Sequence, residues 1–371
     1  MRIGVPKEIK DHEFRVGLVP SGVRALCQAG HSVAVQKGAG LAIGFTDAQY
    51  SQAGARLVDT AAEAYAGDLV VKIKEPQAAE YPLLRPGLAL FTFLHLAAAP
   101  ELAARLRETR VTALAYETVR DAAGRLPLLA PMSQIAGRLA IQAGAAALTL
   151  INGGNGTLLP GVPGVPPGKV VILGAGIVGS NAARMAIGMG ADVTLLDVDI
   201  ARLGRLEDLF GSRIKTCYSE PDSVARETAG ADLLIGAVLV PGAHAPHLLD
   251  RSLIGTMKPG SALVDVAIDQ GGCAETSRPT THSQPTYVEE GVVHYCVTNM
   301  PSAVARTSTL ALAQATFPFI AQIAAAGVQQ ALRNDPGLAA GLNFFDGHCT
   351  HATLAQELGT PYLPPLAVLD C

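Results

Sequence analysis

Charged residues are scarce in this sequence, and their scarcity excludes several classes of partner. Asp, Glu, Lys and Arg together make up 16% of the 371 residues, and the formal net charge is -4. A chain without an excess of positive charge is poorly suited to non-specific binding of nucleic acid or of an anionic membrane. The first ten residues, MRIGVPKEIK, also lack the apolar run of a secretory signal. We therefore expect a cytoplasmic protein that binds small molecules, with neither nucleic acid nor membrane as a partner.

The sequence also lacks the spacings with which cysteine and histidine bind zinc. No two cysteines form a C-x-x-C pair, His244 and His247 flank a proline, and His348 and His351 have no clustered acids near them. In a large chain without a secretory signal, cysteines are expected to be free thiols, with a catalytic cysteine as the alternative. The six cysteines are Cys27, Cys217, Cys273, Cys296, Cys349 and Cys371.

Alternating strand-like and helix-like runs indicate an α/β protein with two domains. The chain is long for one domain, and its 49% hydrophobic residues suit a large buried core. Apolar runs such as RIGVP, DLVVKIK and LALFTFLHL alternate with helical spacing, as in parallel sheets. We predict a discontinuous substrate domain from residues 1–128 and 306–371, and a nucleotide-binding domain from residues 129–305. Each is expected to be Rossmann-like, a mostly parallel sheet flanked by helices, with the active site in the cleft between them.

One apolar stretch, Leu310–Leu332, is long enough to cross a membrane. Gln314, Pro318 and Gln322 interrupt it, and such residues are uncommon in the apolar core of a bilayer. We therefore predict a core or interface helix of a soluble protein.

A glycine-rich turn at residues 174–179 predicts a dinucleotide site. The segment GAGIVG follows the apolar run KVVIL and precedes a helix-like run, which is the context of the G-x-G-x-x-G fingerprint. Gly174 permits the tight turn, Gly176 lets a pyrophosphate approach the backbone, and Gly179 lets helix and strand pack closely. Asp197 ends the next strand, where a carboxylate bonds the adenosine ribose and repels a 2′-phosphate, so NAD is favoured over NADP. Arg202 lies nearby and weakens that preference.

Three polar residues of the first domain stand at the ends of predicted strands. Arg15 follows the first strand, Lys74 ends DLVVKIK, and His95 interrupts LALFTFLHL. Each has an ordinary alternative: a solvated loop arginine, a lysine whose stem covers apolar surface, and a core histidine with satisfied hydrogen bonds. Their shared position at strand ends makes them candidates for binding and chemistry.

Further polar residues end the late strands of the second domain. Asp265 and Asp269 lie in DVAIDQGG, and Asn299 lies in TNMPSAV. Open α/β sheets bind ligands at the carboxyl ends of their strands. Asp265 could cap or orient the loop, Asp269 lies further out toward a cofactor, and Asn299 can bond an amide or a carbonyl.

Several long stretches together resemble the alanine dehydrogenase family. They include GVPKEIKDHEFRVGLVP, KIKEP, FTFLHLA, PLLAPMS, VDVAIDQGG and NMPSAVARTST, and they run in order to about residue 309. The resemblance implies NAD-dependent interconversion of L-alanine with pyruvate and ammonium. It implies that Arg15 and Lys74 bind the substrate, that His95 is an acid/base, and that Asp269 is a second catalytic group.

The resemblance also implies further contacts and a homo-oligomer, commonly a hexamer. Met132 and Asn299 are implied near the substrate. The chain has Gln134 where the family often has an acid, and Gln322 and Ala326 where some members hold a metal, so no metal is predicted. Besides the glycines, Asp197, Arg202 and Asp269, the implied cofactor contacts are Ser133, Ile177, Val178, Ser219, Val238, Leu239, Val266, Ala267, Ile268, Val297, Asn299 and Met300.

Three other functions compete with this interpretation. The NAD-binding part of proton-translocating transhydrogenase has the same two-domain plan but needs no amino acid. That family usually carries Arg, Gln and Asp in a loop where this chain has PLLAPMSQIAGR, which favours the dehydrogenase. Saccharopine dehydrogenase would need room for a larger substrate. A non-catalytic NAD-binding protein would not need both Lys74 and His95.

Overall fold

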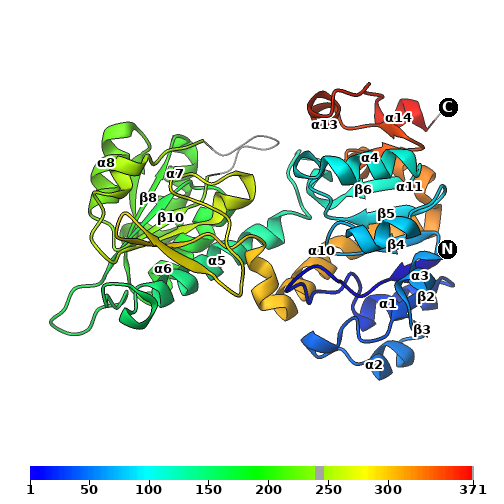
Figure 1. The fold of residues 1–371 in the computed structure, drawn as a ribbon, viewed down its shortest axis with the longest axis horizontal. Helices are drawn as coiled ribbons and strands as arrows, with labels where there is room; N and C mark the ends of the chain where they lie inside the picture. The colour runs from blue at the N-terminus through cyan, green and yellow to red at the C-terminus, as the bar shows by residue number, and fades with distance from the viewer. Residues whose placement is uncertain (239–245, 370–371) are drawn as a thin grey trace. The chain divides into compact units, whose positions relative to one another are not determined.

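The chain forms two compact units in a computed structural model that describes residues 1–238 and 246–369. Unit 1 combines Met1–Met132 with Val304–Cys371, and unit 2 is Ser133–Ala303 (Figure 1). The chain leaves unit 1 within a helix, α5 (Ala130–Ala147), rather than in a loop. Unit 2 is therefore a continuous segment inserted into a unit that both chain ends build.

The described residues of unit 1 form an eight-stranded sheet of the doubly wound type. Its order is β15-β14-β6-β5-β4-β1-β2-β3, and the six strands from the N-terminal segment are parallel. Strand order reverses between β1 and β4, which is the position where such sheets bind ligands. The strands are β1 (Arg2–Val5), β2 (Ser32–Gln36), β3 (Arg56–Val58), β4 (Leu69–Val71), β5 (Ala89–Thr92), β6 (Thr112–Ala115), β14 (Leu342–Phe345) and β15 (His348–Cys349).

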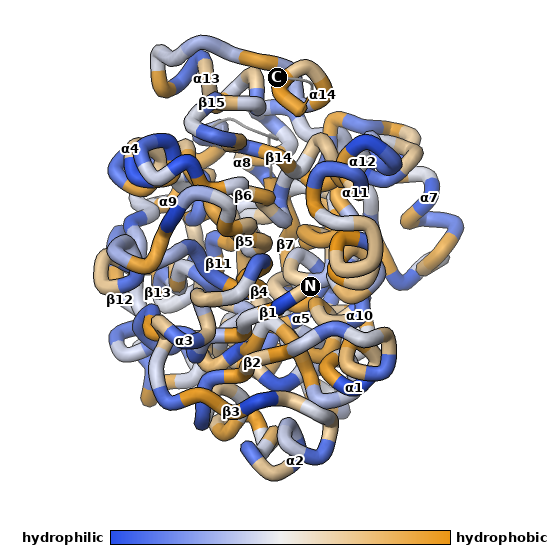
Figure 2. Tube along the Cα trace, turned by 90° about the vertical axis from the view of Figure 1, so that its right-hand side faces the viewer, coloured by the Kyte–Doolittle hydropathy of each residue, from blue (hydrophilic) through white to orange (hydrophobic). Residues whose placement is uncertain are grey.

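Helices cover the sheet of unit 1. The exposed helices carry polar and charged residues, and the strands beneath them are apolar. Helix α4 (Pro100–Glu108) carries charged residues and is largely blue in Figure 2, whereas β5 and β6 are almost entirely buried. The other helices of this unit are α1 (Pro20–Gln28), α2 (Asp47–Gln52), α3 (Ala61–Tyr65), α10 (Ala305–Ala326), α11 (Val328–Asn334), α12 (Pro336–Ala339), α13 (Ala352–Glu357) and α14 (Pro365–Val368). Short 3-10 helices are η1 (Leu41–Ile43), η2 (Ala78–Leu83), η3 (Leu96–Ala98) and η4 (Tyr116–Thr118).

The apolar stretch at residues 310–332 is not one helix. Gly327 has a φ of 78°, and this left-handed residue ends α10 at Ala326 and starts α11 in a new direction. Residues 300–326 are long and apolar enough to cross a membrane by length and composition, and 39% of their most apolar window is buried. Within unit 1, α10 packs against α1, where a side chain on Gly22 would lie 3.2 Å from the Phe317 ring.

The described residues of unit 2 form a seven-stranded sheet in the order β12-β13-β11-β10-β7-β8-β9. Six of these strands are parallel, and β7 coincides with the apolar run KVVIL that precedes the glycine-rich turn. Alternate residues of β7 face two separate apolar clusters, so both faces of the sheet are buried, as parallel sheets require. The strands are β7 (Lys169–Leu173), β8 (Asp192–Asp197), β9 (Lys215–Tyr218), β10 (Leu233–Gly236), β11 (Ala262–Asp265), β12 (Thr286–Glu289) and β13 (Val292–Tyr295).

Close packing of two helices sets one face of unit 2. A Cβ on Gly137 of α5 would lie only 2.1 Å from the carbonyl oxygen of Val178 in α6 (Ile177–Met189), so the two backbones touch where only glycine fits. The remaining helices are α7 (Ile200–Phe210), α8 (Pro221–Ala229), α9 (Arg251–Ile254), η5 (Leu150–Asn152), η6 (Gly211–Arg213), η7 (Val266–Gln270) and η8 (Met300–Val304). The prediction of two Rossmann-like, mostly parallel sheets flanked by helices is thereby confirmed.

A buried histidine of β13 is expected to make the stability of unit 2 sensitive to acid. The His294 ring is fully buried, with Nδ1 2.9 Å from the Val292 carbonyl and Nε2 2.8 Å from the Thr276 hydroxyl. Burial lowers the pKa of His294 below its ordinary value. His294 of the unfolded chain is therefore protonated below about pH 6.5, whereas His294 of the folded chain stays neutral to lower pH. The free energy of unfolding is expected to fall as the pH drops from about 7 to about 5.5.

Urea unfolding of the wild type and of His294→Gln at both pH values checks this expectation. The variant should lose part of the acid-induced fall. His351, whose pKa burial also lowers, is present in both proteins and supplies a constant background. An equal fall in both proteins would contradict the assignment to His294.

Candidate functional site

The three candidate residues of unit 1 lie at one edge of its sheet. Arg15 follows β1, Lys74 follows β4, and His95 follows β5. Strands β1, β4 and β5 are consecutive neighbours and parallel, so their carboxyl ends open at the same edge. The edge includes the point where strand order reverses, and the three side chains therefore mark it as the candidate substrate site.

Arg15 is buried and paired rather than solvated. Its side chain is 2% exposed, and Nε and Nη2 donate to the two carboxylate oxygens of Glu13 at 2.7 and 2.6 Å. Nη1 lies 3.1 Å from the sulfur of Met132, so two residues implied to contact the substrate touch one another. The alternative of a solvated loop arginine is wrong. Sequence reasoning missed Glu13, although a buried arginine must have an acidic partner.

A buried ion-pair cluster lies beside Lys74. Lys72 is fully buried, with its Nζ 2.7 Å from Glu80 and 3.2 Å from Glu8. Burial disfavours the Lys72 ammonium, but the two carboxylates outweigh it and raise its pKa. Glu8 also accepts the backbone N–H groups of Ile73 and Lys74, at 2.7 and 3.3 Å. This cluster, which the sequence analysis did not identify, fixes the backbone that carries Lys74.

Lys74 itself is mostly buried. The residue is 9% exposed, and its carbonyl accepts a hydrogen bond from the hydroxyl of Thr92 at 2.9 Å. Its backbone is thus held by Glu8 on one side and by β5 on the other. A side chain this enclosed does not behave as a surface lysine that keeps its ammonium in bulk water.

His95 is exposed and held in an unusual backbone conformation. Its φ of 47° and ψ of 44° lie in the left-handed region, and its ring stacks on Phe93 at 5.7 Å with an interplanar angle of 6°. Its backbone N–H donates to Glu117 at 2.6 Å. The alternative of a core histidine is wrong, because the residue is exposed.

The glycine-rich turn of unit 2 has the geometry that a dinucleotide needs. Gly174 has a φ of 105°, and a Cβ on Gly179 would lie 1.7 Å from the Gly174 carbonyl oxygen. Among the described residues, no atom lies within 4 Å of the position of a Cβ on Gly176, so the backbone is open there. Helix α6 begins at the next residue, and the N-terminus of a long helix favours phosphate.

Asp197 braces this turn from the end of β8. One carboxylate oxygen accepts the N–H of Ala175 at 2.6 Å, and the other accepts the N–H of Asp199 at 2.8 Å. Arg202 lies 3.8 Å from Asp197 and 3.3 Å from Asp199, so its charge is balanced by two acids. Because the two carboxylates neutralise Arg202, this residue offers little positive charge to a 2′-phosphate. This arrangement fits the predicted preference for NAD over NADP.

Asp197→Ala is expected to weaken NAD⁺ binding about ten- to a hundredfold, because it removes charge-assisted hydrogen bonds. The same change should reduce the preference for NAD⁺ over NADP⁺. Calorimetric titration with both nucleotides measures the two effects. Asp192→Ala is the matched control, since Asp192 starts the same strand and pairs with Lys215 at 2.7 Å. Unaltered NAD⁺ affinity in Asp197→Ala would reject the ribose assignment.

The two aspartates at the end of β11 differ in burial and in role. Asp265 is fully buried and accepts bonds from the N–H groups of Ala267 and Cys273 and from the Ser277 hydroxyl, at 3.1, 2.8 and 2.6 Å. It thus caps and orients η7, while Asp269 lies exposed on the same turn.

The other implied cofactor residues differ in exposure. Asn299 has a φ of 60° and is half-buried, as are Ser133, Ser219, Val238 and Val266. Leu239 lies outside the described residues. Ile177 is exposed and Val178 is half-buried at the start of α6. The last four residues are between 1% and 7% exposed, so they belong to the core and leave mainly main-chain atoms for a ligand. These four are Ala267, Ile268, Val297 and Met300.

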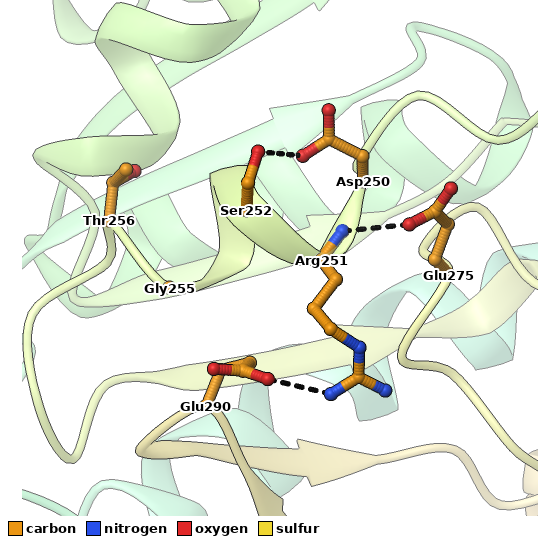
Figure 3. A pocket seen from close by; sticks show the side chains of 7 residues that line it. All are labelled: Asp250, Arg251, Ser252, Gly255, Thr256, Glu275 and Glu290. Atoms are coloured by element: carbon orange, nitrogen blue, oxygen red, sulfur yellow. Dashed lines mark hydrogen bonds and ion pairs between the residues drawn. The ribbon is translucent and has the colours of Figure 1, made fainter.

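A surface hollow of unit 2 lies apart from the predicted residues. The hollow has a volume of about 590 Å³, and in it Arg251 pairs with Glu290 at 2.6 Å and Ser252 with Asp250 at 2.7 Å. The side chains that line it are drawn in Figure 3. The polar side chains there bond one another, and the predicted residues do not line it. Within residues 1–238 and 246–369, no group of three or more His, Cys, Asp or Glu could hold a metal ion. Five cysteines are free thiols, and Cys371 and His244 lie outside the described residues.

Comparison with known proteins covers both units. The family descriptions that match are "Alanine dehydrogenase/PNT, N-terminal domain" over residues 4–136 and "Alanine dehydrogenase/PNT, C-terminal domain" over residues 140–352. The chain is 54% identical to the alanine dehydrogenase of Halomonas elongata over 370 residues, which is 100% of both chains.

Two solved structures are also similar. An L-alanine dehydrogenase superposes with a TM-score of 0.94 and 53% identity, covering 97% of this chain and 99% of the other. A transhydrogenase from Sinorhizobium meliloti superposes with a TM-score of 0.82 and 26% identity, covering 94% of this chain and 100% of the other.

Proposed function

Because the chain belongs to the alanine dehydrogenase/PNT family, we propose that it is an NAD-dependent alanine dehydrogenase. The reaction converts L-alanine, NAD⁺ and water to pyruvate, ammonium, NADH and a proton, and it is reversible. One observation carries the proposal: identity to an alanine dehydrogenase is 54% over the full length of both chains. Identity to the transhydrogenase is only 26%, which favours the dehydrogenase over the nearest alternative.

The residues of unit 2 fit NAD. The open backbone at Gly176 and the start of α6 suit the pyrophosphate, and Asp197 suits the adenosine ribose. When bound, NAD⁺ supplies the hydride acceptor at the nicotinamide ring. The half-buried Ser133, Ser219 and Asn299 would add polar contacts.

The residues of unit 1 bind the substrate and move protons. Arg15 holds the carboxylate with charge-assisted hydrogen bonds, and Glu13 fixes the plane of its guanidinium. Lys74 contacts the carboxylate or the keto oxygen as a cation. It forms no Schiff base, because ammonia supplies the nitrogen. Met132, in contact with Arg15, provides an apolar surface beside a small substrate.

His95 and Asp269 carry out the acid–base chemistry of the proposed reaction. The exposed imidazole of His95 gives and takes the protons of carbinolamine formation and collapse. The exposed carboxylate of Asp269 either orients the water that attacks the iminium or stabilises the positive charge of the iminium. Asp269 comes from η7, which Asp265 holds in place.

NADH oxidation by the purified protein tests the proposal. Oxidation with pyruvate that requires ammonium, together with NAD⁺ reduction by L-alanine, is the expected result. Oxidation without ammonium would indicate a keto-reductase instead. Tight NADH binding without oxidation would favour the transhydrogenase-like function or a non-catalytic binding protein.

We further propose that the protein works in the cytoplasm as a homo-oligomer, with a hexamer as the expected assembly. Full-length similarity to alanine dehydrogenases supports this extension. Light scattering coupled to size-exclusion chromatography measures the mass. A mass of one chain, 38.2 kDa, would contradict it.

A further inference from the structure

We propose that Glu117 is a positioning residue that holds the backbone of His95 in its left-handed conformation and so aims the imidazole at the substrate. The proposal rests on the proposed function for the role of His95, but the contact itself does not. Glu117 lies on η4, directly after β6, and was not among the residues that the sequence indicated.

The carboxylate of Glu117 accepts hydrogen bonds from two consecutive backbone N–H groups of the neighbouring turn. Its Oε1 accepts from His95 at 2.6 Å and from Leu94 at 3.2 Å, and its Oε2 lies 3.3 Å from the Leu94 nitrogen. The contact is a consequence of strand register. Thr92 at the end of β5 pairs with Ala115 at the end of β6, so the two turns begin side by side. An ionised acceptor makes these bonds stronger than bonds between neutral groups.

The backbone of His95 needs such a support. A non-glycine residue with a φ of 47° crowds its own Cβ against the backbone. Conformations of this kind persist only where the surroundings impose them. Removal of the Glu117 carboxylate should therefore release residues 94 and 95 to more common dihedral angles.

The same segment also supports the ring of His95. Phe93 stacks on the imidazole, and the rings of Phe93 and Tyr116 form a T-shaped pair with centroids 5.1 Å apart and an interplanar angle of 83°. Tyr116 is adjacent to Glu117 in η4. In the described part of the chain, no hydrogen bond joins the Glu117 carboxylate to the imidazole itself. Glu117 thus acts on the direction of the ring through the backbone.

Turnover measurements separate positioning from general stability. We expect Glu117→Ala to lower kcat about a hundredfold, the cost of a catalytic group displaced by about 1 Å. The KM for pyruvate and the affinity for NADH should stay within about twofold of the wild type, since neither ligand touches residue 117 in the proposal. Glu117→Gln keeps one acceptor oxygen and should recover most of kcat.

Two controls sharpen the result. Asp121→Asn is the matched variant, because Asp121 also accepts two backbone N–H groups, both at 2.9 Å, in the loop after η4. It should change kcat less than about twofold. In a His95→Ala background, Glu117→Ala should lower kcat no further, since residues that act as a unit are not additive. An equal loss in both backgrounds, or a wild-type kcat in Glu117→Ala, would overturn the proposal.

Amide hydrogen exchange tests the contact independently of activity. Peptides that cover residues 93–98 should exchange faster in Glu117→Ala than in the wild type and in Asp121→Asn. This readout distinguishes the two proposals. A wild-type protein without ammonium-dependent turnover but with this exchange pattern would retain the positioning contact and reject the function. Unchanged exchange in Glu117→Ala would reject the positioning role.

Discussion

Replacing His95 with alanine is expected to lower kcat by about 10²- to 10⁴-fold, the usual contribution of a positioned acid/base group. NADH binding should not change, because the cofactor residues belong to unit 2 while His95 belongs to unit 1. Single-turnover hydride transfer and NADH titration measure the two quantities separately. Normal turnover in the variant would remove His95 from the mechanism.

A second substitution controls for the backbone at residue 95. Alanine tolerates a φ of 47° poorly, so His95→Ala combines the effect of a changed turn with that of a missing imidazole. Asparagine is enriched in left-handed conformations and cannot titrate. His95→Asn should therefore keep the turn and still lose most of kcat. Recovery of activity in His95→Asn would indicate that the turn, and not proton transfer, matters at this position.

Arg15→Ala is expected to have two large effects with different causes. The loss of charge-assisted hydrogen bonds to the substrate carboxylate should raise the KM for pyruvate about a hundredfold or more. The loss of the guanidinium should also weaken folding, because the Glu13 carboxylate loses two hydrogen bonds in a place where both side chains are at most 2% exposed. Breaking a buried ion pair costs about 3–5 kcal/mol of folding free energy.

A double variant separates the two effects of Arg15. Glu13→Gln with Arg15→Met removes both buried charges, and such a replacement is often neutral for stability. We expect this protein to unfold near the wild-type urea concentration while its KM for pyruvate stays high. If Glu13→Gln with Arg15→Met bound pyruvate normally, the clamp role of Arg15 would be wrong. If Arg15→Ala were as stable as the wild type, the ion pair would not be a structural support.

Most strands that were predictable from the sequence are apolar runs buried in a sheet, although β9 was predicted and has no buried position. Runs such as KVVIL and ALFT are apolar without interruption, and their positions follow from that alone. Strands β3, β12, β14 and β15 were not predicted. Strands β3 and β15 have only three and two residues, and β12 has an exposed or half-exposed residue at every position. The buried strand β14 pairs with β6, which lies far earlier in the chain. Their pairing depends on neighbours that are distant in the chain, which local patterns do not reveal.

The end of α10 was missed for a different reason. Residues 310–332 are apolar on both sides of Gly327, and hydropathy alone does not show where such a run turns. The left-handed φ of this glycine is what divides α10 from α11. A glycine inside an apolar run can signal a helix end, and here that signal was outweighed by the surrounding residues.

Some residues of the candidate site were predictable from the sequence, and others were not. The strand-end positions of Arg15, Lys74 and His95 followed from the alternating pattern, and the glycine turn followed from its spacing. The carboxylates that hold these residues in place were not predicted from either pattern. Glu8, Glu13 and Glu117 are linked to their partners by contacts that exist only in the folded unit, apart from the short Glu13–Arg15 step. Lys72 could have indicated these acids from the sequence. It lies in the apolar run DLVVKIK, and a lysine buried at the end of such a strand needs acidic partners.

The insertion of unit 2 into unit 1 has a consequence for synthesis on the ribosome. Strand β14 pairs with β6, and Asn343 bonds Thr118, which lies 225 residues earlier. All of unit 2 has been translated before β14 exists, so its sheet can be completed while β6 is still an unpaired edge. Contacts of such long range form slowly, and uncovered edges invite wrong pairing. Nascent chains that stop before residue 342 should therefore contain a folded nucleotide-binding unit and depend on chaperones for the other one.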